Sequence, residues 1–186
     1  MHRQILNLLL ARYREAWPLE AALVQRFVDF VAARSDCLLR SCGPGHITAS
    51  AWIEDHTGEL ALLTHHKKLG RWLQLGGHVD GETAVERAAL REAEEESGLS
   101  AFTFQRWQDE LVPLDLDVHS IPARAAEPQH DHWDVRFWLR AGAGQPLVLS
   151  AESNDLRWFS PAELRSVTTE ESVLRLARKA ASLRRR

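Results

Sequence analysis

Apolar residues recur at helical spacing over the first 34 residues, and this pattern predicts two helices. The stripe of the first helix is Ile5, Leu6, Leu9 and Leu10, and that of the second is Leu19, Leu23, Phe27, Phe30 and Val31. These stripes pack either on the domain's own core or against a second copy of the chain. Because glycine and proline at 43–45 break the pattern, we expect an N-terminal helical extension over residues 1–44 and one further domain over 45–186.

Alternation of apolar and polar residues predicts strands in most of the remaining chain. The expected strands are 46–54, 60–63, 102–104, 113–121, 130–140, 147–149 and 156–159. Helices are expected from about Ala84, where Thr83 and Glu86 have capping-box spacing, to Gly98, and again after Ser160 and from about Glu170. Strands mixed with helices in this order predict an α/β (α+β) fold.

Composition excludes several classes of protein. Apolar residues make up 45% of the chain and charged residues 26%, which is typical of a globular domain. The net charge of −3 provides no basic field for a nucleic acid polymer. Cys37 and Cys42 are too few for a disulfide framework, so we expect buried thiols. No apolar run has the roughly 18 residues that span a bilayer, and no signal peptide is recognised, so we expect a cytoplasmic protein without membrane contact.

Three glutamates of the predicted helix after Ala84 share one face. Glu92, Glu95 and Glu96 have i, i+3 and i+4 spacing, so their carboxylates reach a common point. A charged helix face is often only solvated. Here, however, a glycine-rich bend precedes the helix, and crowded carboxylates favour a hard divalent cation, Mg²⁺ above all.

The stretch from Gly77 to Leu99 resembles the signature box of the Nudix hydrolases. The residues that match the box are Gly77, Arg91, Glu92, Ala93, Glu95, Glu96, Gly98 and Leu99. The sequence departs from the box at Thr83, where the family has its first glutamate. In the family that glutamate supports the loop and the arginine, and either Glu82 or Asp80 is expected to replace it after a one-residue shift of the loop.

The resemblance implies a Nudix-type α/β/α sandwich around a mixed sheet. It also implies a Mg²⁺-dependent hydrolase, with Mn²⁺ as the alternative ion, that cleaves a diphosphate linkage in a nucleoside diphosphate joined to another moiety, by attack of a metal-activated water on phosphorus. The implied metal ligands are Glu92, Glu95, Glu96 and the carbonyl of Gly76. Arg91 would orient the glutamates, Glu95 would be catalytic, and Glu152 lies where family members often keep a further catalytic glutamate.

Several cations and imidazoles, most of them outside the box, are candidates for substrate binding. Residues 65–71 contain a cationic cluster that begins at His65 and ends at Arg71, and we expect it on a loop. This cluster either neutralises substrate phosphates or is simply solvated. The substrate-binding residues that we expect are Arg71, His78, His119, His132 and Asp134. His130 and His132 point to one face of a strand and would also suit zinc or copper, but no third ligand is evident, so contact with phosphate or a base is preferred. The loop 122–129 is expected to lie over the binding site.

Two other functions compete with hydrolysis. One is a nucleotide-binding module of Nudix fold that has lost turnover, favoured only by Thr83. The other is an enzyme like isopentenyl-diphosphate isomerase, which is disfavoured because Gly76 stands where that enzyme has a cysteine. The expected partners are a small-molecule diphosphate, most simply a nucleotide, and a second copy in a homodimer.

Overall fold

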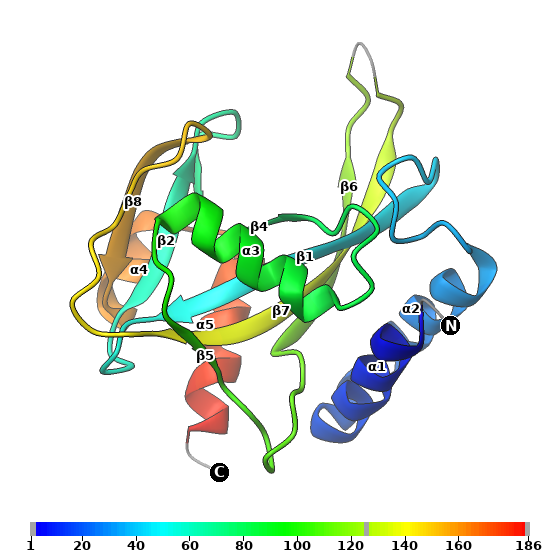
Figure 1. Cartoon of the computed structure of the whole chain (residues 1–186), viewed down its shortest axis with the longest axis horizontal. Helices are drawn as coiled ribbons and strands as arrows, with labels where there is room; N and C mark the ends of the chain where they lie inside the picture. Colours follow the sequence, from blue (N-terminus) through cyan, green and yellow to red (C-terminus); the bar gives the residue numbers. More distant parts are fainter. Residues whose placement is uncertain (1–2, 125–126, 185–186) are drawn as a thin grey trace.

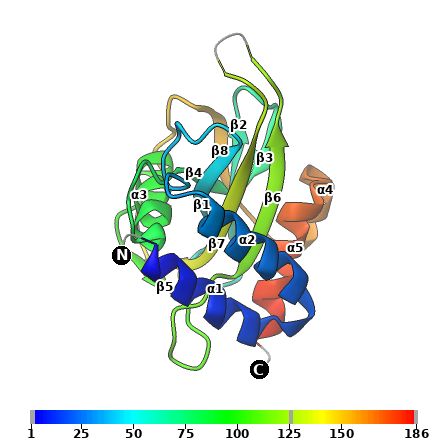
Figure 2. The ribbon, with the colours of Figure 1, turned by 90° about the vertical axis from the view of Figure 1, so that its right-hand side faces the viewer.

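The chain folds into three layers, with a mixed sheet between helices. The structure is a computed structural model that describes residues 3–124 and 127–184. Helix α3 covers one face of the sheet, and α4 and α5 cover the other, as the two perpendicular views show (Figures 1 and 2). The α/β fold with an α/β/α arrangement is therefore confirmed.

The described elements follow one another along the chain as a helical hairpin and then mixed strands and helices. They are α1 (Gln4–Ala16), a 3₁₀ turn (Pro18–Glu20), α2 (Ala21–Ala33), β1 (Gly45–Glu54), β2 (Ala61–His66), β3 (Arg71–Leu73), β4 (Leu75–His78), α3 (Val85–Ser97), β5 (Phe102–Phe104), β6 (Asp115–Ile121), β7 (His130–Ala141), β8 (Ser153–Phe159), α4 (Pro161–Val167) and α5 (Glu171–Leu183).

Strands β1 and β7 form the centre of the sheet and run parallel to each other. The other pairings are antiparallel: β4 and β2 pair with β1, β3 and β8 pair with β2, and β5 and β6 pair with β7. Every residue of β1 is buried. Other strands pair with both of its edges, and helices pack on both faces of the sheet. Alternate residues of β1, such as Ile47, are apolar and pack in the core between the sheet and α3.

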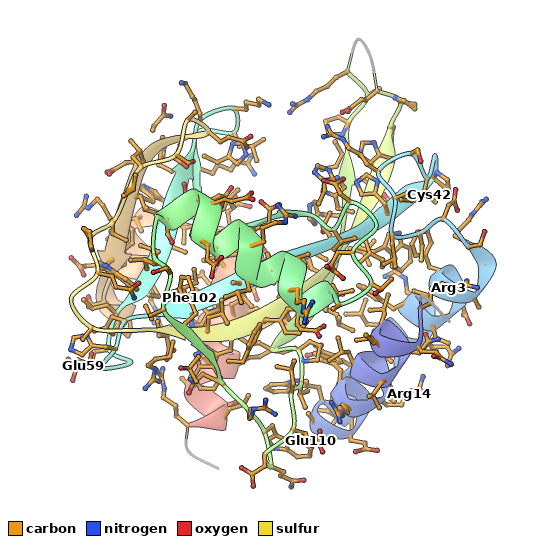
Figure 3. The ribbon with its side chains drawn as sticks, viewed as in Figure 1. Arg3, Arg14, Cys42, Glu59, Phe102 and Glu110 are labelled. Atoms are coloured by element: carbon orange, nitrogen blue, oxygen red, sulfur yellow. The ribbon has the colours of Figure 1, made fainter. Side chains whose placement is uncertain are left out.

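The two N-terminal helices pack on the domain's own core. Leu6, Leu10 and Phe27 are fully buried in the same cluster as Ile47 and Val135. Packing on the core is thus the alternative that the structure shows for most of these stripes, whereas Ile5 and Leu19 are exposed. Figure 3 labels Arg3 and Arg14, which link this hairpin: Arg3 donates to the carbonyl of Val31, and Arg14 donates to Oε1 of Gln25 at 3.0 Å.

Three local expectations were wrong. Residues 147–149 form no strand; the amide of Val148 bonds the carbonyl of Ser97 instead. His65 and His66 belong to β2 and Arg71 to β3, rather than to a loop. Ala84, not Thr83, is the N-cap of α3, and no side chain caps it. The expected end at Gly98, which has left-handed backbone, and the capping box at Ser160 are confirmed.

The structure describes only part of the loop 122–129 that is expected over the site. Residues 125–126 lie outside the described residues, and Arg124 and Glu127, which flank them, pair with each other in an isolated β-bridge. Within 3–124 and 127–184, none of the helices has the length and apolar character that crossing a membrane requires. Cys37 and Cys42 are free, buried thiols, as expected.

Candidate active site

A pocket of about 510 Å³ opens between β4, the acidic face of α3, the end of β6 and the start of β7. Its lining includes nine of the residues expected to be catalytic, to bind the metal or to bind the substrate. These are Gly76, His78, Glu92, Glu95, Glu96, His119, His132, Asp134 and Glu152. The fold therefore brings together segments that are far apart in the chain, with carboxylates on one wall and imidazoles on the other.

Arg91 holds the carboxylate wall together. Its Nη1 lies 2.8 Å from Oε1 of Glu92 and 3.0 Å from Oε2 of Glu95, and its Nη2 donates to the carbonyl of His78 at 2.8 Å. A guanidinium has several donors in a fixed plane, so it can orient two carboxylates and a carbonyl at once. This geometry agrees with the orienting role that the family resemblance implies for Arg91.

Two glycines of β4 let the backbone approach the glutamates closely. A Cβ on Gly77 would lie 2.6 Å from Oε2 of Glu92, so only glycine leaves room for that carboxylate. A Cβ on Gly76 would overlap Ser50, and its φ of 155° is one that L side chains rarely adopt. The amide of Gly76 donates to Oε2 of Glu96 at 3.2 Å.

Burial and mutual repulsion shift the titration of these carboxylates. The pKa of Glu96 is raised to about 7, first because burial disfavours its charged form and then because Glu92, Glu152 and Glu95 are close. The pKa of Glu92 is raised as well, by burial against the opposing effect of Arg91. A cluster of oxygen ligands that repel one another in a half-buried site suits a hard divalent cation, so the residues fit Mg²⁺.

Glu152 faces α3 from the turn before β8. Its charge contributes to the raised pKa of both Glu92 and Glu96, which places it within electrostatic reach of the cluster. The amide of Lys67 donates to its backbone carbonyl at 2.9 Å. The position is consistent with the catalytic role expected for Glu152, which stays a prediction.

Paired residues of β1, β7 and β6 form a row of imidazoles on the opposite wall. His46 of β1 pairs with His132 of β7, and His132 pairs with His119 of β6. The ring of His78 lies 5.0 Å from that of His46 and 5.3 Å from that of His132, centroid to centroid. Sequence alone missed His46, because only the parallel register of β1 and β7 reveals it.

Asp134 supports this wall from within. Its Oδ1 accepts a hydrogen bond from Thr48 at 3.1 Å, and its Oδ2 accepts from Ser50 at 2.8 Å and from Nε of Arg136 at 2.8 Å. Since both oxygens are engaged and the residue is 3% exposed, we revise its expected role from substrate contact to support of the wall.

The buried guanidinium of Arg136 ties the wall to α5. Its Nη2 donates to Asp117 at 2.9 Å and its Nη1 to Asp115 at 3.3 Å, and Arg175 of α5 bonds both aspartates from the other side. Asp134 and Lys179, which donates to Asp115 at 2.8 Å, belong to the same network. These three carboxylates and three cations satisfy one another, where a single charge would be costly to bury. Asp115 and Asp117 therefore have a mainly structural role.

One expected substrate-binding residue lies away from the pocket. Arg71 is not found among the described residues that line the pocket, and it pairs with Glu170 at 3.0 Å. Lys68, Arg40 and Arg124 line the pocket instead.

Glu82, beside Thr83, accepts a hydrogen bond from the amide of Ala84 at 2.9 Å. It therefore supports the loop at the start of α3, while the carbonyl of His78 holds Arg91.

Comparison with known proteins agrees with this geometry. The NUDIX domain family model matches residues 44–178. A NUDIX-family hydrolase from Clostridium perfringens is 27% identical, with a TM-score of 0.60 over 74% of this chain and 97% of that one. Two more distant structures share the fold: an Ap4A hydrolase from C. elegans (18% identity, TM-score 0.58, 73% and 95% covered) and an E. coli dihydroneopterin triphosphate pyrophosphohydrolase (15%, 0.54, 75% and 96%).

In this α/β/α sandwich, a helix with three glutamates on one face packs against a glycine-rich strand. Together with the match of the family model over 44–178, this arrangement shows that the chain belongs to the NUDIX family. It is accordingly a pyrophosphohydrolase-type enzyme.

Proposed function

We propose that the chain is a Mg²⁺-dependent hydrolase that cleaves the diphosphate linkage of a nucleoside diphosphate joined to another moiety. The observation that supports this most directly is the convergence of Glu92, Glu95, Glu96 and Glu152 on one pocket with the backbone of Gly76. Mn²⁺ is the alternative ion, since it accepts the same oxygen ligands.

The proposed ion would be held by Glu92, Glu95, Glu96 and the Gly76 carbonyl. When bound, it would neutralise charge on the substrate phosphates and activate the attacking water. Arg91 keeps the carboxylates in place through its bonds to Glu92 and Glu95. Glu95 and Glu152 are the candidates for accepting the proton of the attacking water.

Cationic and imidazole side chains on the other side of the pocket fit an anionic substrate. Lys68 and Arg124 provide positive charge for phosphate oxygens, in the role first expected of Arg71. Arg40 lines the pocket too, but it is paired with Glu127 at 2.9 Å. His78 and His119 present ring nitrogens and faces to the same space. A nucleotide meets both requirements, since it has a charged diphosphate and a flat base.

The remaining expectations about context belong to this proposal. We propose a cytoplasmic protein with a domain boundary near residue 45, acting on a small molecule rather than on a nucleic acid polymer. The apolar groove between α1 and α2, which includes Leu10 and Val28, would be covered in the proposed homodimer.

A substrate screen tests the proposal. The purified chain is incubated with Mg²⁺ and a panel of diphosphate compounds, namely nucleoside triphosphates, dinucleoside polyphosphates, ADP-sugars, coenzymes and non-nucleotide diphosphates. Products are separated by chromatography, and reaction in ¹⁸O-labelled water shows which phosphorus is attacked. We expect one class to be hydrolysed, with loss of turnover on chelation and recovery with Mg²⁺ or Mn²⁺.

Binding without hydrolysis across the whole panel would contradict the proposal and favour the nucleotide-binding module. Turnover of isopentenyl diphosphate without release of phosphate would favour the isomerase.

A further inference from the structure

Three histidines at one end of the pocket are close enough to share an ion. His46 of β1 and His130 and His132 of β7 each offer a ring nitrogen, and these three nitrogens lie within 4.8 Å of one another. The ring centroids form a nearly equilateral triangle, with separations of 5.1 Å, 4.8 Å and 5.2 Å. The parallel register that pairs His46 with His132 fixes this triangle.

His46 is a buried polar side chain whose hydrogen-bonding capacity is unused. It is 2% exposed, and neither ring nitrogen has a hydrogen-bond partner among the described residues. A buried imidazole without partners is costly unless a ligand satisfies it. Its orientation toward two other imidazoles makes a metal ion the ligand that would do so.

His130 already has the contact that orients a metal-binding histidine. Its Nδ1 lies 2.9 Å from the carbonyl oxygen of Pro128. Because a carbonyl only accepts, the proton is on Nδ1, and the lone pair of Nε2 is left free. Metal-bound histidines commonly donate their second ring nitrogen to a backbone carbonyl in this way, which fixes the tautomer and the ring orientation.

The imidazoles are also in the protonation state that binds metals. Burial, together with the neighbouring His78 and His130, lowers the pKa of His46 to about 4. Burial and the adjacent histidines lower the pKa of His132 to about 2. At neutral pH both rings are neutral, so protons compete little with a metal ion for their lone pairs.

We infer that His46, His130 and His132 form a second metal site, selective for a divalent transition ion such as Zn²⁺. Three neutral nitrogen ligands favour Zn²⁺, Co²⁺ or Ni²⁺ over Mg²⁺, which prefers oxygen. Zn–N bonds of about 2.0–2.1 Å place tetrahedral ligand nitrogens ~3.3 Å apart, so the rings must turn inward on binding. No hydrogen bond to the described residues restrains such a rotation of His46.

This site is separate from the carboxylate cluster but opens into the same pocket. His130 and His132 line the pocket together with Glu92 and Glu96, whereas His46 lies behind them. Three protein ligands leave a fourth position of a tetrahedral ion for water or a substrate oxygen, as in open zinc sites. The site would thus give the imidazole wall a positive charge.

Zn²⁺ binding to the full chain tests the inference without any substrate. Calorimetric titration with Zn²⁺ is carried out in a large excess of Mg²⁺, which occupies the carboxylates. Titration with Co²⁺ adds a spectroscopic readout, since its visible absorption reports nitrogen coordination. We expect one equivalent of Zn²⁺ to bind and one equivalent of Co²⁺ to give the absorption of a four-coordinate nitrogen site.

Three variants locate the bound ion. His130→Ala removes a half-exposed ligand, which spares the core, and we expect the affinity for Zn²⁺ to fall about 100-fold or more. His66→Ala removes an imidazole from the same pocket but outside the triangle, and Glu95→Gln alters the carboxylate cluster; both should keep Zn²⁺ binding unchanged. Circular dichroism confirms that each variant is folded.

Two outcomes would overturn the inference. One is Zn²⁺ binding that survives in His130→Ala and is lost in Glu95→Gln, which would place the ion at the carboxylates. The other is absence of Zn²⁺ binding in excess Mg²⁺. A raised KM of His130→Ala for the substrate found in the screen would then indicate that the histidines contact phosphate or a base directly. Because Zn²⁺ is titrated without substrate, failure of this inference leaves the proposed hydrolase untouched.

Discussion

Arg91 of α3 donates a hydrogen bond to the backbone carbonyl of His78 in β4 at 2.8 Å, while its other terminal nitrogen binds Glu92 and Glu95. One guanidinium therefore connects the carboxylate wall to the strand that leads into the imidazole wall. Its side chain is 41% exposed, so it contributes to the geometry of the site more than to the core.

Replacement of Arg91 tests this connection. In Arg91→Lys a point charge remains, but it cannot bond two carboxylates and a carbonyl together, so we expect the affinity for Mg²⁺ to fall about 10- to 100-fold with the fold intact. Arg87→Lys, an exposed site one turn earlier on α3, is the matched control and should bind Mg²⁺ normally. Mg²⁺-dependent turnover curves measure both, and equal affinities would contradict the role of Arg91.

Glu95→Gln is expected to lower kcat about 100-fold or more, because the amide can neither carry the charge that holds a cation nor accept a proton. The carboxylate is 58% exposed, so the melting temperature should stay close to that of the parent chain. Glu94→Gln, its exposed neighbour outside the pocket lining, controls for the loss of one negative charge from α3. Near-normal turnover with intact Mg²⁺ affinity would refute the assignment of Glu95.

The two glycines of β4 should respond differently to alanine. In Gly77→Ala the three atoms nearest to the new methyl belong to the end of the Glu92 side chain, which can move away. We expect Mg²⁺ affinity to fall about tenfold, with less than about 1 kcal/mol lost in the free energy of unfolding. In Gly76→Ala the methyl overlaps Ser50 of β1, and residue 76 has a backbone conformation that strains alanine. We expect the free energy of unfolding to fall by about 2 kcal/mol or more.

Urea denaturation together with Mg²⁺ titration separates these two effects. The interpretation fails if Gly77→Ala is the less stable of the two variants.

Acid pH should weaken the network around Asp117. Burial alone would raise the pKa of this carboxyl, but the hydrogen bond from His119 and the charges of Arg136 and Arg175 outweigh it and hold the pKa well below its usual range. A carboxyl with a lowered folded-state pKa adds stability above its unfolded value of about 4, and this stability is lost as the pH falls further.

We therefore expect the free energy of unfolding of Asp117→Asn at pH 7 to be about 2 kcal/mol lower than that of the parent chain. This gap between the two free energies should narrow between pH 4 and pH 2. Urea denaturation across this range measures the gap, and Asp29→Asn, an exposed site on α2, should show none. A gap that does not change with pH would mean that Asp117 stabilises the fold through packing alone.

The carboxylate wall could be predicted from the sequence because its geometry is local. Glu92, Glu95 and Glu96 share one helix, and the 3.6-residue period alone places them on one face. The imidazole wall could not, since His46 and His132 meet only through the register between two strands that are distant in the chain. Strand spacing predicted that His130 and His132 share a face, but it contains no information about the third ring.

Local pattern also failed where tertiary context decides. Leu147 to Leu149 have the composition of a strand, yet Val148 bonds the end of α3, where its methyl groups lie close to Gly98. Asp134 and Arg136 alternate with apolar residues as a solvent-facing side would, but α5 covers that side of β7, and both became buried. Alternation shows that two faces differ, not that the polar face is exposed to water.

The parallel pairing of β1 with β7 joins residues 86 positions apart, such as Thr48 and Asp134. Closing so long a loop costs entropy before any contact rewards it, which makes such pairings slow steps in folding. During synthesis, the glutamates of α3 are added to the chain before His130 and His132. A chain interrupted before β7 would therefore have the carboxylates without these two histidines of the facing wall.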